Sequence, residues 1–136
     1  MIDSEQTAFV DTNVLVRHLT GDPPAMAQRA TRFLADASVL LLVDLVAAEL
    51  VHVLESYYRR PRSEVARALR SLIGFRSIRV VDAALLHRAV EVYEHDRLDF
   101  AEAYLVASAE RSGIGAVASF DRSIDRVTTV RRIEPA

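Results

Sequence analysis

Short apolar runs alternate with stretches of helical periodicity along this 136-residue chain, and this alternation restricts its fold more than any other feature. The runs expected as strands are residues 7–11, 39–43, 77–81 and 116–119, with 127–133 as an edge strand. Helices are expected at 13–19, from Pro23 or Pro24 to 36, and at 45–59, 62–73, 83–96 and 99–112, the last ending before Gly113. The pattern predicts an α/β fold of three layers, with a mostly parallel central sheet of four to five strands flanked by helices.

The length and composition suit one globular domain. A chain of 136 residues, 51% of them hydrophobic, can bury a full core, so we expect a single domain over residues 1–136. The longest aliphatic run, residues 39–43, is too short to span a bilayer, and no signal-peptide pattern opens the chain. We therefore expect a cytoplasmic protein that is not attached to a membrane.

Two residue types are missing, and their absence excludes several chemistries. The sequence contains no cysteine, which excludes disulfides, thiolate metal sites and a cysteine nucleophile. Lysine is also absent, since all seventeen basic residues are arginine. A Walker A phosphate loop and Schiff-base catalysis both require lysine and are excluded as well.

Acidic residues occur at the expected strand ends and on the helices that follow. Asp11 ends the first apolar run, in "AFVDTNVLVRHL", and Asp121 follows the last core strand, in "ASFD". Glu49 lies one turn into the helix after the second strand, whereas Asp99 and Glu102 open a later helix and share one of its faces. Ligands of parallel sheets bind at the carboxyl ends of the strands, so these acids are candidates for an active site.

Each acid also has a structural interpretation. Asp11 is a possible N-cap, Asp99 and Glu102 resemble a capping box, and Asp121 is suited to starting a turn. Asp44 is a candidate cap for the helix at 45–59. Glu49 is different, because a carboxylate among apolar neighbours must find a partner or lie exposed. A structural role is favoured for each acid alone, but their common placement favours a shared site.

Clustered carboxylates are best explained by a shared cation. At about 5 Å two carboxylates repel by about 3 kcal/mol at an effective dielectric of about 20, unless a divalent ion lies between them. An all-oxygen ligand set suits Mg²⁺ or Mn²⁺ rather than zinc. The histidines lack a metal-binding spacing and are expected to be structural or surface residues; they are His18, His52, His87 and His95.

Positive charge is concentrated in one segment. Residues 59–79 contain seven arginines and one acid, in a chain whose net charge is −2. The segment is either a solvated helix face or a surface for phosphate groups beside the acidic site. No aromatic-rich run predicts a platform for stacking bases.

The four acidic motifs together resemble those of the PIN-domain ribonucleases, and specifically the VapC-type toxins of toxin–antitoxin pairs. The resemblance covers essentially the whole chain. It rests on "FVDTNVLVRHL", "AAEL" around Glu49, "DFAEAYLVASA" and "ASFDRSID", in this order and at these spacings.

This resemblance implies a PIN-like fold and a Mg²⁺-dependent endoribonuclease, with Mn²⁺ able to substitute. It assigns Asp11, Glu49, Glu102 and Asp121 to an acidic quartet, with Asp99 as a fifth acid; Asp11, Asp99, Glu102 and Asp121 are the implied metal ligands. Glu102 stands where the family more often has Asp, so either Asp99 or Glu102 is the direct ligand. The implied supporting residues are Asn13 and Ser119, and the candidate RNA-binding residues are Arg17, Arg59, Arg60 and Arg62. The family also implies a homodimer and a VapB-like antitoxin partner.

Other functions remain as alternatives. A PIN-domain RNA-processing nuclease without an antitoxin is the closest one, followed by a degenerate PIN fold that only binds a partner. A haloacid-dehalogenase-type phosphatase requires a second acid where this chain has Asn13, and a receiver domain requires a lysine that the chain lacks.

Overall fold

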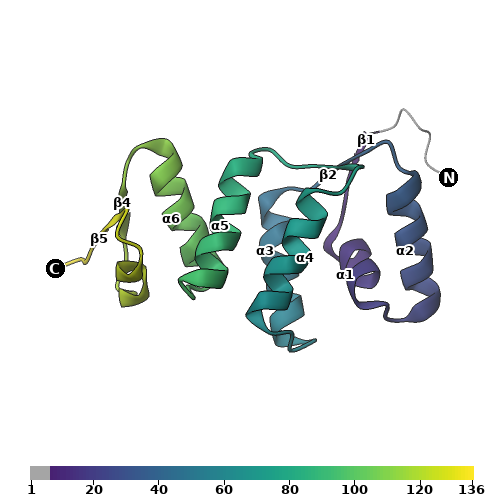
Figure 1. The fold of residues 1–136 in the computed structure, drawn as a ribbon, viewed down its shortest axis with the longest axis horizontal. Coiled ribbons are helices and arrows are strands. Elements are labelled where there is room, and N and C mark those ends of the chain that lie inside the picture. Colours follow the sequence, from purple (N-terminus) through teal and green to yellow (C-terminus); the bar gives the residue numbers. More distant parts are fainter. Residues whose placement is uncertain (1–6) are drawn as a thin grey trace. The chain divides into compact units, whose positions relative to one another are not determined.

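The computed structural model describes residues 7–136, which divide between Val81 and Asp82 into two compact units. The first unit contains β1 (Thr7–Phe9), α1 (Thr12–Thr20), α2 (Pro24–Asp36), β2 (Val39–Leu41), α3 (Asp44–Ser56), α4 (Arg62–Ile73) and β3 (Ile78–Arg79). The second unit contains α5 (Ala83–His95), α6 (Phe100–Ser112), β4 (Ala116–Ala118), the 3₁₀ helix η1 (Arg122–Arg126) and β5 (Arg131–Ile133). Every helix and strand expected from the sequence forms (Figure 1), which confirms the α/β fold class.

The first unit is built on a parallel sheet in the order β1-β2-β3. Ala8 is paired with Leu40, and Leu40 with Ile78, so the apolar run of β2 occupies the middle of the sheet. Leu40 is fully buried, as its central position requires. Helix α1 packs against both α2 and α3, and α3 packs against α4 (Figure 1). The end of β1 and the start of α1 therefore lie beside α2 and α3.

The second unit consists of a helical hairpin and a small parallel sheet. Helices α5 and α6 pack along their lengths, and β4 pairs with β5 in parallel (Figure 1). Tyr93 is fully buried and contacts the ring of Phe100 edge-on, with 6.0 Å between ring centroids. Gly113 ends α6 at a φ of 79°, the left-handed conformation for which glycine was expected there.

The structure differs from the sequence-based expectations at several element ends. The five strands form a three-stranded and a two-stranded sheet, one in each unit, and every strand is shorter than its apolar run. Asp44 is the first residue of α3, and Val43 occupies the N-cap, so the capping role expected of Asp44 is wrong. That helix also ends at Ser56 rather than at residue 59.

None of the helices formed by residues 7–136 combines the length and the apolarity needed to cross a membrane.

Candidate active site

In the first unit, Asp11 and Glu49 line one pocket of about 340 Å³. Asp11 precedes α1 as its N-cap, and its Oδ1 accepts a hydrogen bond of 2.7 Å from the backbone N–H of Thr12. Glu49 lies on α3, which packs against α1. The complete lining is Asp11, Thr12, Asn13, Val16, Arg17, Asp22, Glu49, Val53, Tyr57 and Tyr58. The expected proximity of these two acids is therefore present.

Glu49 is exposed, and none of the described residues bonds to its carboxylate. Its neighbours Ala47 and Leu50 are fully buried, so α3 turns one face into the core and presents Glu49 on another. Within residues 7–136, Glu49 makes no hydrogen bond and no ion pair. The sequence allowed Glu49 either to have a partner or to lie exposed, and in the structure it lies exposed.

Two polar atoms of this pocket are buried without a partner. The Thr12 side chain is 4% exposed, and its Oγ1 has no hydrogen-bond partner among the described residues. The Nε of Arg17 is also buried and unpaired, and the Nη1 of Arg17 makes a long bond of 3.4 Å to the carbonyl of Asp22. Buried polar groups are normally paired, so these atoms indicate a place where a polar ligand or water binds.

Two aromatic side chains that were not among the expected site residues also line the pocket. Tyr57 and Tyr58 pack edge-on against each other, with 4.9 Å between ring centroids, and the Tyr58 hydroxyl donates a 3.1 Å bond to Asp22 Oδ2. The available signal was helical spacing, because Val53 and Tyr57 follow Glu49 at intervals of four residues and share its face.

In the second unit, Asp99 and Glu102 lie at the start of α6. Asp99 occupies the N-cap position, but its side chain makes no capping hydrogen bond. The capping-box interpretation of the pair is therefore wrong. Glu102 lies in the first turn and is half-buried. An exposed Asp at an N-cap that does not cap has its carboxylate available for another role.

Asp121 follows β4 and caps η1. Its Oδ1 accepts a 2.9 Å bond from the backbone N–H of Ser123, and its own backbone N–H donates a 2.9 Å bond to the hydroxyl of Ser119. Hydrogen bonding from the side chain and the backbone of Ser123, aided by the charges of Arg126 and Arg132, lowers the pKa of Asp121 below its ordinary value. Asp121 is therefore ionised at neutral pH.

The five acids are thus distributed over both units, two in the first and three in the second. In the part of the chain that the structure describes, no group of three or more acidic or histidine side chains is placed to hold a metal ion. The donor chemistry nevertheless fits Mg²⁺ or Mn²⁺, because Asp11 and Glu49 present carboxylates to a pocket that also holds the Asn13 amide and the unpaired Thr12 hydroxyl.

The histidines take the structural and surface positions expected of them. His18 lies half-buried, its Nδ1 is 2.8 Å from the Thr31 hydroxyl, and its ring meets Phe75 edge-on. Burial lowers the pKa of His18, so its imidazole is favoured in the neutral form. The other three histidines are exposed.

Comparison with known proteins identifies the family. The sequence matches the PIN domain family over residues 8–130, a span that includes all five acids. Among solved structures, the chain is similar to the crystal structure of VapBC2 from Rickettsia felis bound to a DNA fragment from their promoter, at 12% identity and a TM-score of 0.38, covering 96% of this chain and 100% of that one. No curated protein gave a match. The match to the family over nearly the whole sequence shows that this chain belongs to the PIN domain family.

Proposed function

We propose that this protein is a divalent-metal-dependent endoribonuclease that hydrolyses RNA phosphodiester bonds as the VapC-type toxin of a toxin–antitoxin pair. The observation that carries the proposal is the pocket in which the Asp11 and Glu49 carboxylates lie beside the incompletely paired Arg17. Membership of the PIN domain family supports a nuclease. Carboxylates suit a hard cation, and a guanidinium suits the phosphate of the substrate.

The proposed site residues are the acids of the four motifs. Asp11, Asp99, Glu102 and Asp121 are the proposed metal ligands, and Glu49 acts with them on the attacking water. A bound Mg²⁺ or Mn²⁺ supplies polarisation of the scissile phosphate and acidification of a water molecule. Neighbouring polar residues support two of these carboxylates. The Ser119 hydroxyl accepts a hydrogen bond from the backbone N–H of Asp121, and the Asn13 amide lines the pocket with Asp11.

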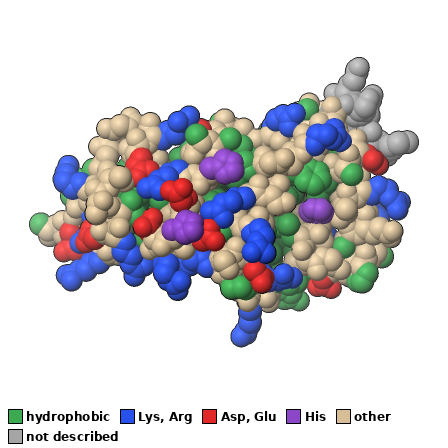
Figure 2. Space-filling model, in the orientation of Figure 1, with side chains coloured by type: hydrophobic (Ala, Val, Ile, Leu, Met, Phe, Trp, Pro, Cys, Tyr) green, Lys and Arg blue, Asp and Glu red, His purple; other side chains and the backbone are tan. Residues whose placement is uncertain are grey.

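Four arginines are proposed to hold the RNA backbone. Arg17 lines the acidic pocket, whereas Arg59, Arg60 and Arg62 lie within the four residues that follow the two pocket tyrosines. Arg59 and Arg60 are exposed, and the Arg60 side chain lies 3.7 Å from the Glu64 carboxylate in a long ion pair. Figure 2 shows basic side chains protruding near the loop that joins α3 to α4. Guanidinium groups in such positions bind phosphates without reading sequence.

The proposal extends to a homodimer in the cytoplasm and to a VapB-like antitoxin that blocks the site. These parts rest on the resemblance of the four acidic motifs. A PIN-domain RNA-processing nuclease is the alternative, and a short VapB-like reading frame beside the gene distinguishes the two.

Cleavage of RNA by the purified protein tests the proposal. We expect cleavage in Mg²⁺ or Mn²⁺, none in EDTA, and a loss of about 10- to 100-fold or more in Asp11→Asn and in Asp121→Asn. Asp36→Asn is the matched control, because Asp36 is an exposed acid at the end of α2. Calorimetry with Mn²⁺ alone should show binding that weakens at least about tenfold in Asp11→Asn. Cleavage or binding that is equal in Asp11→Asn and the wild type contradicts the mechanism.

A further inference from the structure

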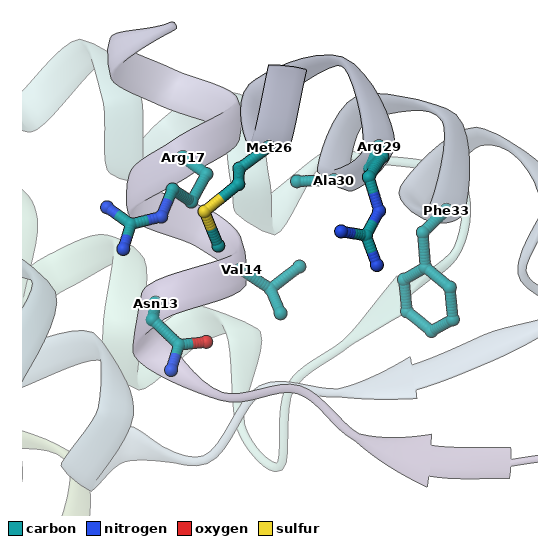
Figure 3. A pocket seen from close by; sticks show the side chains of 7 residues that line it. All are labelled: Asn13, Val14, Arg17, Met26, Arg29, Ala30 and Phe33. Atoms are coloured by element: carbon teal, nitrogen blue, oxygen red, sulfur yellow. The ribbon is translucent and has the colours of Figure 1, made fainter. Parts of the chain in front are cut away.

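A second pocket lies next to the acidic one in the first unit. It has a volume of about 460 Å³ and is formed between α1 and α2 (Figure 3). Its lining residues are Asn13, Val14, Arg17, Met26, Arg29, Ala30 and Phe33. Asn13 and Arg17 also line the pocket of Asp11 and Glu49, so the two cavities adjoin. A ligand that reaches the acids can extend into this second pocket.

The interior of the second pocket is apolar and suits a flat ring. Val14 lies at its centre, the Met26 side chain reaches in from α2 toward Val14, and the Phe33 ring lies to one side (Figure 3). Arg29 and Phe33 are four residues apart and share one face of α2. A pocket of this volume, with a thioether, an aromatic ring and a guanidinium, has the size and chemistry to receive a nucleobase.

Among the described residues, the two cations of this pocket are incompletely paired. Arg29 makes no hydrogen bond or ion pair with any of the described residues, and the buried Nε of Arg17 is likewise unpaired. None of the residues that line the pocket is acidic. A buried guanidinium N–H without an acceptor is unfavourable, and a phosphate oxygen is the acceptor that guanidinium geometry fits best.

We propose that this pocket is a nucleotide subsite, which binds the residue adjoining the scissile phosphate of single-stranded RNA. Arg17, which borders both pockets, and Arg29 contact backbone phosphates, while the base enters beside Met26 and Phe33. Only an unpaired nucleotide can turn its base into such a pocket, so a paired strand does not occupy it. This inference rests on the proposed ribonuclease function and adds to it the residues that receive one nucleotide.

RNA affinity measured without catalysis tests the subsite. A fluorescently labelled, mixed-sequence single-stranded RNA of ten nucleotides is titrated with protein in EDTA, so that no cleavage occurs. We expect Arg29→Gln and Phe33→Leu each to weaken binding at least about fivefold, since one stacked base and one phosphate contact carry such a difference. The slope of log Kd against log salt should decrease by about 0.7 in Arg29→Gln and stay unchanged in Phe33→Leu.

Arg32→Gln is the matched control for charge. Arg32 is an exposed arginine on the same helix that does not line the pocket, so its variant should bind RNA within about twofold of the wild type. A duplex of the same length should bind equally to the wild type and to Phe33→Leu. Circular dichroism confirms that each variant is folded, and Arg29 is exposed enough for its variant to fold even where Phe33→Leu does not.

The outcomes separate this inference from the proposed function. If the wild type cleaves RNA but Arg29→Gln and Phe33→Leu bind and cleave as it does, the subsite is overturned and the nuclease stands. In that case the pocket takes another occupant, such as an apolar protein segment. If the wild type binds single strands through the pocket but does not cleave RNA with any metal, the subsite stands and the nuclease function fails. An absence of RNA binding by the wild type overturns the subsite.

Discussion

The hydroxyl of Ser119 accepts a hydrogen bond from the backbone N–H of Asp121, with 2.9 Å between Oγ and N. The Asp121 carboxylate in turn accepts from the backbone N–H of Ser123 at 2.9 Å. These two bonds form consecutive turns between β4 and η1 and fix the backbone from which the carboxylate projects. Ser119 is therefore a positioning residue for an acid that the proposed reaction requires.

Ser119→Ala should lower RNA cleavage by about tenfold, which is less than the loss expected for Asp121→Asn, because the carboxylate remains but its orientation is released. The concentration of Mn²⁺ needed for half-maximal activity should rise as well. Ser112→Ala is the matched control, since the Ser112 hydroxyl also accepts from an N–H two residues later, at Ile114, outside the proposed site. An equal effect in both variants would show that loss of the turn, rather than placement of Asp121, is responsible.

Glu49→Gln should separate activity from stability. Because Glu49 is exposed and makes no bond within residues 7–136, its free energy of unfolding should stay within about 0.5 kcal/mol of the wild type in urea titrations. RNA cleavage should nevertheless fall about 10- to 100-fold, because a carboxylate of the site is lost. Glu55→Gln, on the same helix but outside the pocket, should keep its cleavage rate. Full activity in Glu49→Gln would exclude Glu49 from the site.

The sequence predicted the two acids of the first pocket for a physical reason. Asp11 ends an apolar run, and Glu49 interrupts the apolar residues 45–51, so both carboxylates differ from their immediate neighbours. The ends of the first and third strands were expected too far along the chain, because the apolar residues Val10 and Val81 follow the last strand residues, Phe9 and Arg79. An apolar run shows that a segment is suited to burial, and it does not show at which residue the strand ends.

The end of α3 and the side-chain caps could not be predicted from the sequence. Tyr57 and Tyr58 follow the last residue of α3, so their placement depends on where that helix ends, which was expected three residues later. Asp44 is the first residue of α3, and Asp99 precedes α6. An acid at a helix start caps the helix only if its side chain reaches the free backbone N–H groups. That choice depends on side-chain conformation, which the residue type leaves open.

Asp99→Ala should be tolerated by the fold, because the Asp99 side chain makes no capping bond to α6. The free energy of unfolding is expected to change by less than about 0.5 kcal/mol. Asp82→Ala is the matched comparison, since Asp82 is the N-cap of α5, accepts from Leu85 N–H at 3.1 Å and pairs with Arg111 at 2.6 Å. Its variant should have the lower melting temperature of the two. Cleavage should follow the opposite order, with activity lost in Asp99→Ala and kept in Asp82→Ala.

The pair of Arg88 on α5 and Glu110 on α6 should make stability depend on pH. Two hydrogen bonds join them, Nε to Oε1 at 2.8 Å and Nη2 to Oε2 at 3.0 Å, and the Thr129 hydroxyl also bonds to Glu110. The hydrogen bond from Arg88 lowers the pKa of Glu110 below its ordinary value of 4.5, against the opposing effect of burial. The stabilisation is thus fully present above pH 4.5 and is lost as the pH falls through the lower folded-state pKa.

Glu110→Gln should therefore lower the free energy of unfolding by about 1–2 kcal/mol at pH 7. The reason is that Arg88 loses the carboxylate that accepts two of its hydrogen bonds. At more acidic pH, where Glu110 of the wild type is protonated in both states, the difference between the two proteins should shrink. Urea unfolding across this pH range measures it. Glu64→Gln, which removes the exposed pair with Arg60, should change stability by less than about 0.5 kcal/mol throughout. A difference between Glu110→Gln and wild type that stays constant across the range would show that the Glu110 charge contributes nothing, since only an ionised carboxylate produces the pH dependence.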